Sequence, residues 1–182
     1  MITLIFIVAA AALIWLIIAY NLFIRDRNLI KEAWSGIDVQ LKRRYNLIPN
    51  LVEVVKGYSK HERKLFEDIT EKRSRTMSIS DKHEKAAAET DISGMLKNIF
   101  AVVENYPDLK ANENFLDLQK QLTDIEDQLQ YARRYFNGTI RRYNIRIESF
   151  PSNIIAAVFD FKQEEFFEIT LATERKVPEV RL

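Results

Sequence analysis

Histidines are the first residues to test for catalytic chemistry, and the chain has two, His61 and His83. His61 is followed by Glu62 in the sequence HERKL, which matches the first half of a zinc-protease helix. That helix needs a second histidine four residues after the first, so that both imidazoles face one metal ion. Leu65 occupies this position. We therefore interpret His61 as an ordinary helix residue and predict neither a metal site nor a cofactor.

Other catalytic motifs are also missing from the sequence. Without cysteine, the chain has no thiolate nucleophile, no disulfide and no cysteine zinc ligand. Its four glycines are scattered, so they form no phosphate-binding loop. Asp108, Glu113 and Asp117 could bind a cation, but helix capping and compensation of the helix dipole explain them more simply. We predict that the protein is not an enzyme.

Basic residues form two clusters with a potential for binding. The first is KRR at 42–44, and the second lies in YARRYFNGTIRRYN at 131–144, where arginines alternate with aromatic residues. Arginine with aromatic residues can bind single-stranded nucleic acid. The formal net charge of +1 argues against a dedicated nucleic-acid binder, and the aromatic residues recur at the spacing of a packed helix face. We predict no nucleic-acid partner.

Packing explains the second cluster better, with its arginines pairing to acidic neighbours in the chain or to partner proteins, and the first cluster could also contact phospholipid headgroups near the membrane. The two clusters form the candidate interaction surface, which comprises Lys42, Arg43, Arg44, Arg133, Arg134, Arg141 and Arg142.

A long apolar segment precedes the first basic cluster. Residues 2–24, ITLIFIVAAAALIWLIIAYNLFI, contain no charged side chain. About 20 apolar residues cross the hydrocarbon core of a bilayer as a helix, so residues 1–24 are predicted to be a transmembrane anchor, with Trp15 and Tyr20 toward one interface. A cleavable signal peptide is the alternative, but the segment lacks a basic n-region, its apolar run is long and unbroken, and Tyr20-Asn21-Leu22 is a poor small-residue cleavage site.

Charges on the two sides of the anchor predict its orientation. Cytoplasmic flanks of membrane helices carry an excess of lysine and arginine. No basic side chain precedes the apolar segment, so the N-terminus is predicted to lie outside and the helical domain in the cytoplasm. The basic residues that follow are Arg25, Arg27, Lys31, Lys42, Arg43 and Arg44.

After the anchor, apolar residues recur at helical spacing almost throughout, which predicts an all-α protein. Proline lacks a backbone N–H and clashes with the preceding helical turn. We therefore expect a kink or short break at Pro49, or a new helix capped by Asn46. Residues 76–85 contain few large apolar groups and are predicted to be a connector. The stripe on both sides of Pro49 comprises Ile30, Ala33, Ile37, Leu41, Ile48, Val52, Val55, Leu65 and Ile69.

Two main helices and a short third one are predicted after the connector. The shorter carries Ile92, Leu96, Ile99 and Val103 on one face. Asn112 can cap the longer helix, which should end at 150–151, where Ser152 can cap a short helix through NIIAAVFDF. The longer helix has a heptad seam of Phe115, Leu118, Leu122, Ile125, Leu129, Ala132 and Phe136, followed by a shift in phase through Ile140, Tyr143 and Ile147.

A heptad seam can line the core of a single chain or join two copies of it. Three other amphipathic segments also need partners, so we favour the single-chain core. The predicted organisation is an anchor at 1–24, an antiparallel bundle of about four long helices at 25–171, and a flexible tail at 172–182. A homo-oligomer remains an open alternative.

Four stretches together resemble the LemA family of bacterial membrane-anchored proteins: EAWSGIDVQLKRRYNLIPNLVEVVKGYSKHE at 32–62, YPDLKANENFLDLQKQL at 106–122, YFNGTIRRYNIRIESFPSNIIA at 135–156 and FFE at 166–168. The resemblance implies one N-terminal transmembrane helix followed by a helical bundle, with no established catalytic activity. It also implies an adaptor or scaffold, since some LemA-like proteins are associated with magnetosome membranes and some occur beside membrane proteases.

Three functions follow from these observations. The first is a non-catalytic interaction or scaffold protein that docks membrane or membrane-associated proteins at the cell membrane. The second is a self-assembling membrane organiser that forms homo-oligomers. The third, a hydrolase with an unfamiliar site around His61, lacks the second histidine that a metal site would need.

Overall fold

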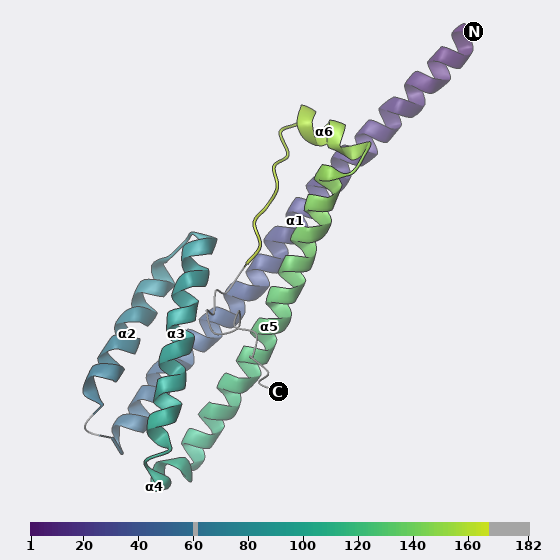
Figure 1. Cartoon of the computed structure of the whole chain (residues 1–182). Coiled ribbons are helices and arrows are strands. Elements are labelled where there is room, and N and C mark those ends of the chain that lie inside the picture. Colours follow the sequence, from purple (N-terminus) through teal and green to yellow (C-terminus); the bar gives the residue numbers. More distant parts are fainter. Residues whose placement is uncertain (60–61, 168–182) are drawn as a thin grey trace, which may run out of the picture. The chain divides into compact units, whose positions relative to one another are not determined.

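A computed structural model describes residues 1–59 and 62–167, and within these residues all regular secondary structure is helical (Figure 1). This confirms the all-α prediction. The predicted tail at 172–182 lies outside the described residues. The helices are α1 (Ile2–Lys56), α2 (Arg63–Ser78), α3 (Lys82–Val103), α4 (Pro107–Lys110), α5 (Glu113–Glu148) and α6 (Ser152–Val158).

Contacts within the chain divide it into two compact units. The first unit contains Met1–Asp38 and Gln130–Phe166, and the second contains Val39–Leu129 and Phe167 among the described residues. The long helices α1 and α5 each contribute one part to each unit.

The first unit is built on an aromatic core between α1 and α5. Phe23 of α1 meets the ring of Tyr143 edge-on, with ring centroids 6.1 Å apart. One end of this core is closed by Phe161, whose ring stacks on Phe23 at 4.6 Å. Burial raises the pKa of the Tyr143 hydroxyl. The core therefore continues the apolar stripe of α1 that the sequence predicted.

The chain after α6 is fastened to α5 by one asparagine. Asn144 Oδ1 accepts a hydrogen bond from the backbone N–H of Glu164 at 3.0 Å, and Asn144 Nδ2 donates to the carbonyl oxygen of Glu164 at 2.8 Å. The backbone N–H and the carbonyl oxygen of Glu164, which lies outside any helix, thereby both have a hydrogen-bond partner.

Ser152 differs from its predicted capping role. The N-cap position of α6 belongs to Pro151, and Ser152 is the first helical residue. The Ser152 hydroxyl lies 2.7 Å from the carbonyl oxygen of Arg146 and 2.8 Å from that of Ser149. Its partners are therefore carbonyl oxygens in the last turn of α5 and directly after it, and not the N–H groups at the start of α6. The short helix also ends at Val158, before the predicted Phe161.

In the second unit, the buried apolar residues come from α1, α2, α3 and the first half of α5, and the short helix α4 adds Leu109. The predicted seam residues of this half of α5 are buried within the single chain, and the predicted face of α3 is buried as well. These core residues include Leu41, Ile48, Val52, Val55, Phe66, Ile69, Ile92, Leu96, Ile99, Val103, Phe115, Leu118, Leu122, Ile125 and Leu129.

Helix ends in this unit depart from the prediction in two places. Helix α1 continues through Pro49 and ends at Lys56, so the expected short break and the Asn46 cap are wrong, while the kink stays a prediction. The connector predicted at 76–85 is shortened to 79–81. It is short because the Asp81 side chain caps α3, accepting from the backbone N–H groups of His83 and Glu84 at 3.0 and 2.9 Å.

Polar side chains at two helix starts have clear electrostatic roles. Hydrogen bonds from the α3 backbone, first that of Glu84, lower the pKa of the Asp81 carboxyl. At the start of α5, Asn112 Oδ1 accepts from the backbone N–H of Phe115 at 3.1 Å. This confirms the predicted Asn112 cap of the longer helix.

Candidate functional site

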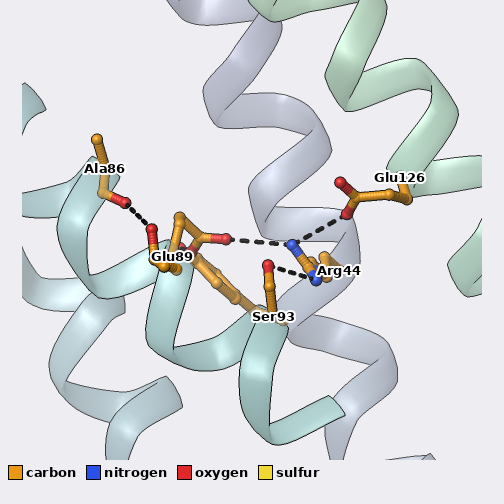
Figure 2. Close-up of polar contacts among 7 residues, drawn as sticks. Arg44, Ala86, Glu89, Ser93 and Glu126 are labelled. Carbon is orange, nitrogen blue, oxygen red and sulfur yellow. Dashed lines mark hydrogen bonds and ion pairs between the residues drawn. The ribbon is translucent and has the colours of Figure 1, made fainter. Parts of the chain in front are cut away.

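The second unit contains a polar cluster in its core, formed by Arg44, Tyr45, Glu89, Ser93 and Glu126, which we call the Arg44 cluster. Arg44 of α1 is only 5% exposed. Its Nη1 lies 3.5 Å from Glu89 Oε2 and 3.3 Å from Glu126 Oε2, while Nη2 donates to Ser93 Oγ at 3.0 Å. Figure 2 shows this guanidinium between α3 and α5. One side chain of α1 thus connects three helices.

Glu89 is the acidic centre of the Arg44 cluster and is 0% exposed. Its Oε2 faces Arg44, and its Oε1 accepts a hydrogen bond from the Tyr45 hydroxyl. A buried carboxylate is costly unless a cation and hydrogen bonds compensate for the lost water. Here both oxygens have partners. The guanidinium and the carboxylate are directed at each other, so the arrangement favours a fixed helix register over catalysis.

The backbone next to the Arg44 cluster explains how α1 continues through Pro49. In an α-helix the carbonyl of Tyr45 would accept from the N–H of residue 49, but proline has none. Arg73 of α2 supplies the missing donor, with Nε 2.6 Å from the Tyr45 carbonyl oxygen. A hydrogen bond between two helices therefore replaces the one that proline removes.

A second buried charge lies in the first unit, in what we call the Asp26 cluster: Asp26, Arg142 and Arg146. Asp26 of α1 is 3% exposed. Arg146 Nε donates to Asp26 Oδ2 at 2.8 Å, and Arg142 Nε lies 3.4 Å from Oδ1. The two arginines are one helical turn apart on α5 and reach the same carboxylate.

The structure separates the first predicted basic group by burial. Lys42 and Arg43 are exposed on α1, and Arg43 Nη1 donates to Gln40 Oε1 at 3.3 Å. Arg44, predicted as part of the outward surface, is instead buried in the cluster that bears its name. Along a helix, neighbouring residues are about 100° apart, so three consecutive basic residues cannot share one face.

The second basic group, on α5, is divided in the same way. Arg134 is exposed and lies over the ring of Tyr131, 4.6 Å from its centroid. Arg141 is exposed, whereas Arg133 is half-buried. Arg142 is partly used by Asp26. The exposed members of the predicted interaction surface are therefore Lys42, Arg43, Arg134, Arg141 and, in part, Arg142.

The histidine motif gives no support for a metal site. His61 lies outside the described residues, and Glu62 directly precedes α2. Among residues 1–59 and 62–167, no group of three or more histidine, cysteine or acidic side chains is placed to hold a metal ion.

The burial of Asp26 and Glu89 was not predicted from the sequence, yet the position of each residue within an apolar stripe indicates it. Asp26 follows Phe23 by three residues and precedes Ile30 by four, so it occupies a position of the apolar stripe. Glu89 precedes Ile92 by three residues in the same way. An acidic residue in register with a core stripe is directed inward and needs a basic partner.

Comparisons with known proteins agree with these observations. A sequence model described as LemA family matches residues 33–182. Magnetosome protein MamQ 1 of Paramagnetospirillum magneticum is 25% identical over 179 residues, which covers 84% of this chain and 66% of the relative. Protein LemA of Metamycoplasma hominis is 28% identical over 149 residues, covering 81% of this chain and 68% of the relative. The chain thus spans just under two thirds of the MamQ relative.

Proposed function

The chain belongs to the LemA family, and we propose that it is a non-catalytic, membrane-anchored helical protein that docks partner proteins at the membrane. The carrying observation is the change in burial along α1. The uncharged residues 2–18 of this helix are almost all exposed, whereas Phe23, Ile30 and Ile37 are buried by the rest of the protein. Such an exposed apolar run is compatible with a bilayer anchor.

We also propose that the long helices form an antiparallel bundle. Support comes from the second unit, where α1, α2, α3 and α5 all bury apolar residues and Arg44 links α1 to α3 and α5. Burial of Phe115, Leu122 and Leu129 inside one chain uses the heptad seam that a homo-oligomer would need. This favours the docking function over self-assembly through that seam.

The proposed docking surface consists of two exposed basic patches: Lys42 and Arg43 in the second unit, and Arg134 and Arg141 in the first. Exposed charges steer association and select partners of opposite charge, so we expect an acidic surface on the partner. The charge rule predicts that these residues lie in the cytoplasm. No observation on the described residues favours the hydrolase alternative.

Site-specific cross-linking in native membranes tests the docking function. A photo-reactive amino acid at Arg43 or Arg141 should give adducts with a distinct partner. The charge reversals Arg43→Glu and Arg141→Glu should lower recovery of that partner by about tenfold, which corresponds to about 1.4 kcal/mol of binding free energy.

Arg63 provides the matched control, because it is an exposed arginine on α2 that pairs with Glu67 at 2.7 Å. A cross-linker or charge reversal at Arg63 should leave partner recovery unchanged. Equal adducts at Arg63 and Arg43 would contradict a specific basic surface. A lone chain without adducts, in membranes where other complexes are cross-linked, would contradict the docking function itself.

A further inference from the structure

The segment from Phe150 to Phe159, which contains α6, exposes an unusual amount of apolar surface. Phe150 is 80% exposed and Val158 is 71% exposed, and Ile154 and Phe159 are also exposed. Soluble proteins rarely leave several large apolar side chains uncovered within one short segment, and such groups commonly mark a contact with a membrane or a partner.

This segment is held against α1 by aromatic rings. Phe159 lies 4.9 Å from Tyr20 between ring centroids, and Phe161 lies 5.8 Å from Tyr20 and 4.6 Å from Phe23. Figure 1 shows α6 beside α1, next to the apolar run at its N-terminal end. The exposed segment therefore lies where the exposed residues 2–18 of α1 give way to residues that are buried, beginning with Ala19.

The level of Tyr20 along α1 corresponds to the edge of a bilayer. A helix rises about 1.5 Å per residue, so Ile2 and Tyr20 are about 27 Å apart along the axis. The hydrocarbon core of a bilayer is about 30 Å thick. If α1 spans the membrane, Tyr20 and the rings around it lie near the boundary between acyl chains and headgroups, where aromatic side chains are favoured.

We propose that residues 150–159 form a second membrane contact, an interfacial platform that rests on the bilayer beside the anchor. Phe150, Ile154 and Val158 insert among the outer parts of the acyl chains. The bilayer is the chosen occupant because the exposed apolar surface of the platform continues that of α1 at residues 2–18. This inference rests on the proposed membrane anchoring.

Basic side chains near the platform match anionic lipid headgroups. Arg25 and Arg27 are exposed on α1 directly after the apolar run, and the Arg27 guanidinium lies 5.9 Å from the centroid of the Phe161 ring. Lys162 is exposed and lies 3.4 Å from the Asp160 carboxylate. Lysine and arginine at this depth attract the anionic lipids of the cytoplasmic leaflet.

Quenching of a fluorophore by brominated lipids tests the platform. The chain lacks cysteine, so single-cysteine variants of the full chain can carry an environment-sensitive dye. We choose Val158→Cys in the platform, Leu13→Cys in the anchor, and Tyr131→Cys as an exposed control on α5. In vesicles of phosphatidylcholine and phosphatidylglycerol with bromine on the acyl chains, dyes at 158 and 13 should lose most of their fluorescence, and the dye at 131 should lose little.

The dye at Leu13 separates failure of the platform from failure of the anchor. Quenching at 13 without quenching at 158 overturns the platform and leaves the anchor intact. A dye at 158 that reports an apolar environment without quenching would indicate a protein partner or a second copy, and also overturns the platform. No quenching at either position overturns both proposals.

A charge variant gives an independent readout of the same platform. With a dye at Ile154→Cys, the substitutions Phe150→Glu and Val158→Glu should abolish quenching, because carboxylates leave the acyl region. These side chains are exposed, so circular dichroism should show an unchanged helix content. Tyr135→Glu on the exposed face of α5 should leave quenching at 154 unaltered. Quenching that persists with both platform glutamates would overturn the proposal.

Discussion

Buried acidic residues show most clearly how single side chains shape this protein. Asp26 and Glu89 each occupy a core position of an apolar stripe and each meets an arginine from another helix. A misaligned helix would leave such a carboxylate without its cation, at a cost of several kcal/mol, about 3–5 for a broken buried pair. These residues therefore select one helix alignment among those that apolar packing alone would permit.

Arg44→Met tests this role at the residue scale. We expect the free energy of unfolding to fall by about 3–5 kcal/mol, because the Glu89 carboxylate stays buried without its cation. The measurement is urea unfolding of the purified chain in detergent, followed by circular dichroism. The neighbouring Arg43→Met serves as control, because Arg43 is exposed, and should change the value by less than about 0.5 kcal/mol.

A combined replacement separates the lost pair from lost packing. Arg44→Met, Tyr45→Phe and Glu89→Leu together remove the charges and the hydroxyl while retaining apolar volume. We expect this variant to recover much of the stability lost in Arg44→Met, since well-packed apolar residues can replace a buried ion pair. If Arg44→Met alone is as stable as Arg43→Met, the Arg44 cluster does not hold the helices.

At the scale of whole elements, the continuity of α1 through Pro49 is the main departure from expectation. Proline inside a helix costs about 3 kcal/mol through the missing N–H and the ring clash. The unpaired carbonyl of Tyr45 is part of this cost, and Arg73 of α2 reduces it by donating a hydrogen bond. Helix α1 is thus completed by a residue of the next helix.

The Pro49–Arg73 relationship predicts non-additive substitutions. Arg73→Met should lower the free energy of unfolding by about 1.5–3 kcal/mol, the contribution of a hydrogen bond to a charged group. Pro49→Ala should stabilise the chain, because alanine restores the N–H. In the Pro49→Ala background the cost of Arg73→Met should shrink, with a coupling energy of about 0.5–3 kcal/mol in a double-mutant cycle. Equal costs in both backgrounds would contradict the replacement bond.

For the whole molecule, the proposed membrane anchor raises the question of which side of the membrane would carry the helical domain. Basic residues follow the apolar run and none precedes it, so the positive-inside rule predicts a cytoplasmic domain. The exposed Arg43 and Arg141 would then face cytoplasmic or membrane-bound partners.

Cysteine accessibility in intact cells measures this topology. Ser80→Cys places a thiol in the exposed connector between α2 and α3, in a chain that otherwise lacks cysteine. A membrane-impermeant thiol reagent should label it only after the cells are permeabilised. A cysteine inserted after Met1 should be labelled in intact cells. The reverse pattern would place the domain and its basic surface outside.

Sequence alone determined the helical class, the apolar run, the Asn112 cap at the start of α5 and the family resemblance. These features depend on periodicity and on interactions between residues close in the chain, which a linear pattern records directly. The buried stripe residues Ile37, Leu41 and Ile48 followed for the same reason.

Two features were decided only by the tertiary structure. They are the charged residues that face inward, and the helix that supplies the hydrogen-bond donor missing at Pro49. Arg43 and Arg44 are adjacent and both basic, yet one is exposed and the other buried, because burial depends on the helices packed against α1. The donor for the Tyr45 carbonyl comes from Arg73, in a different helix. Such pairings join residues distant in sequence, and no local pattern specifies them.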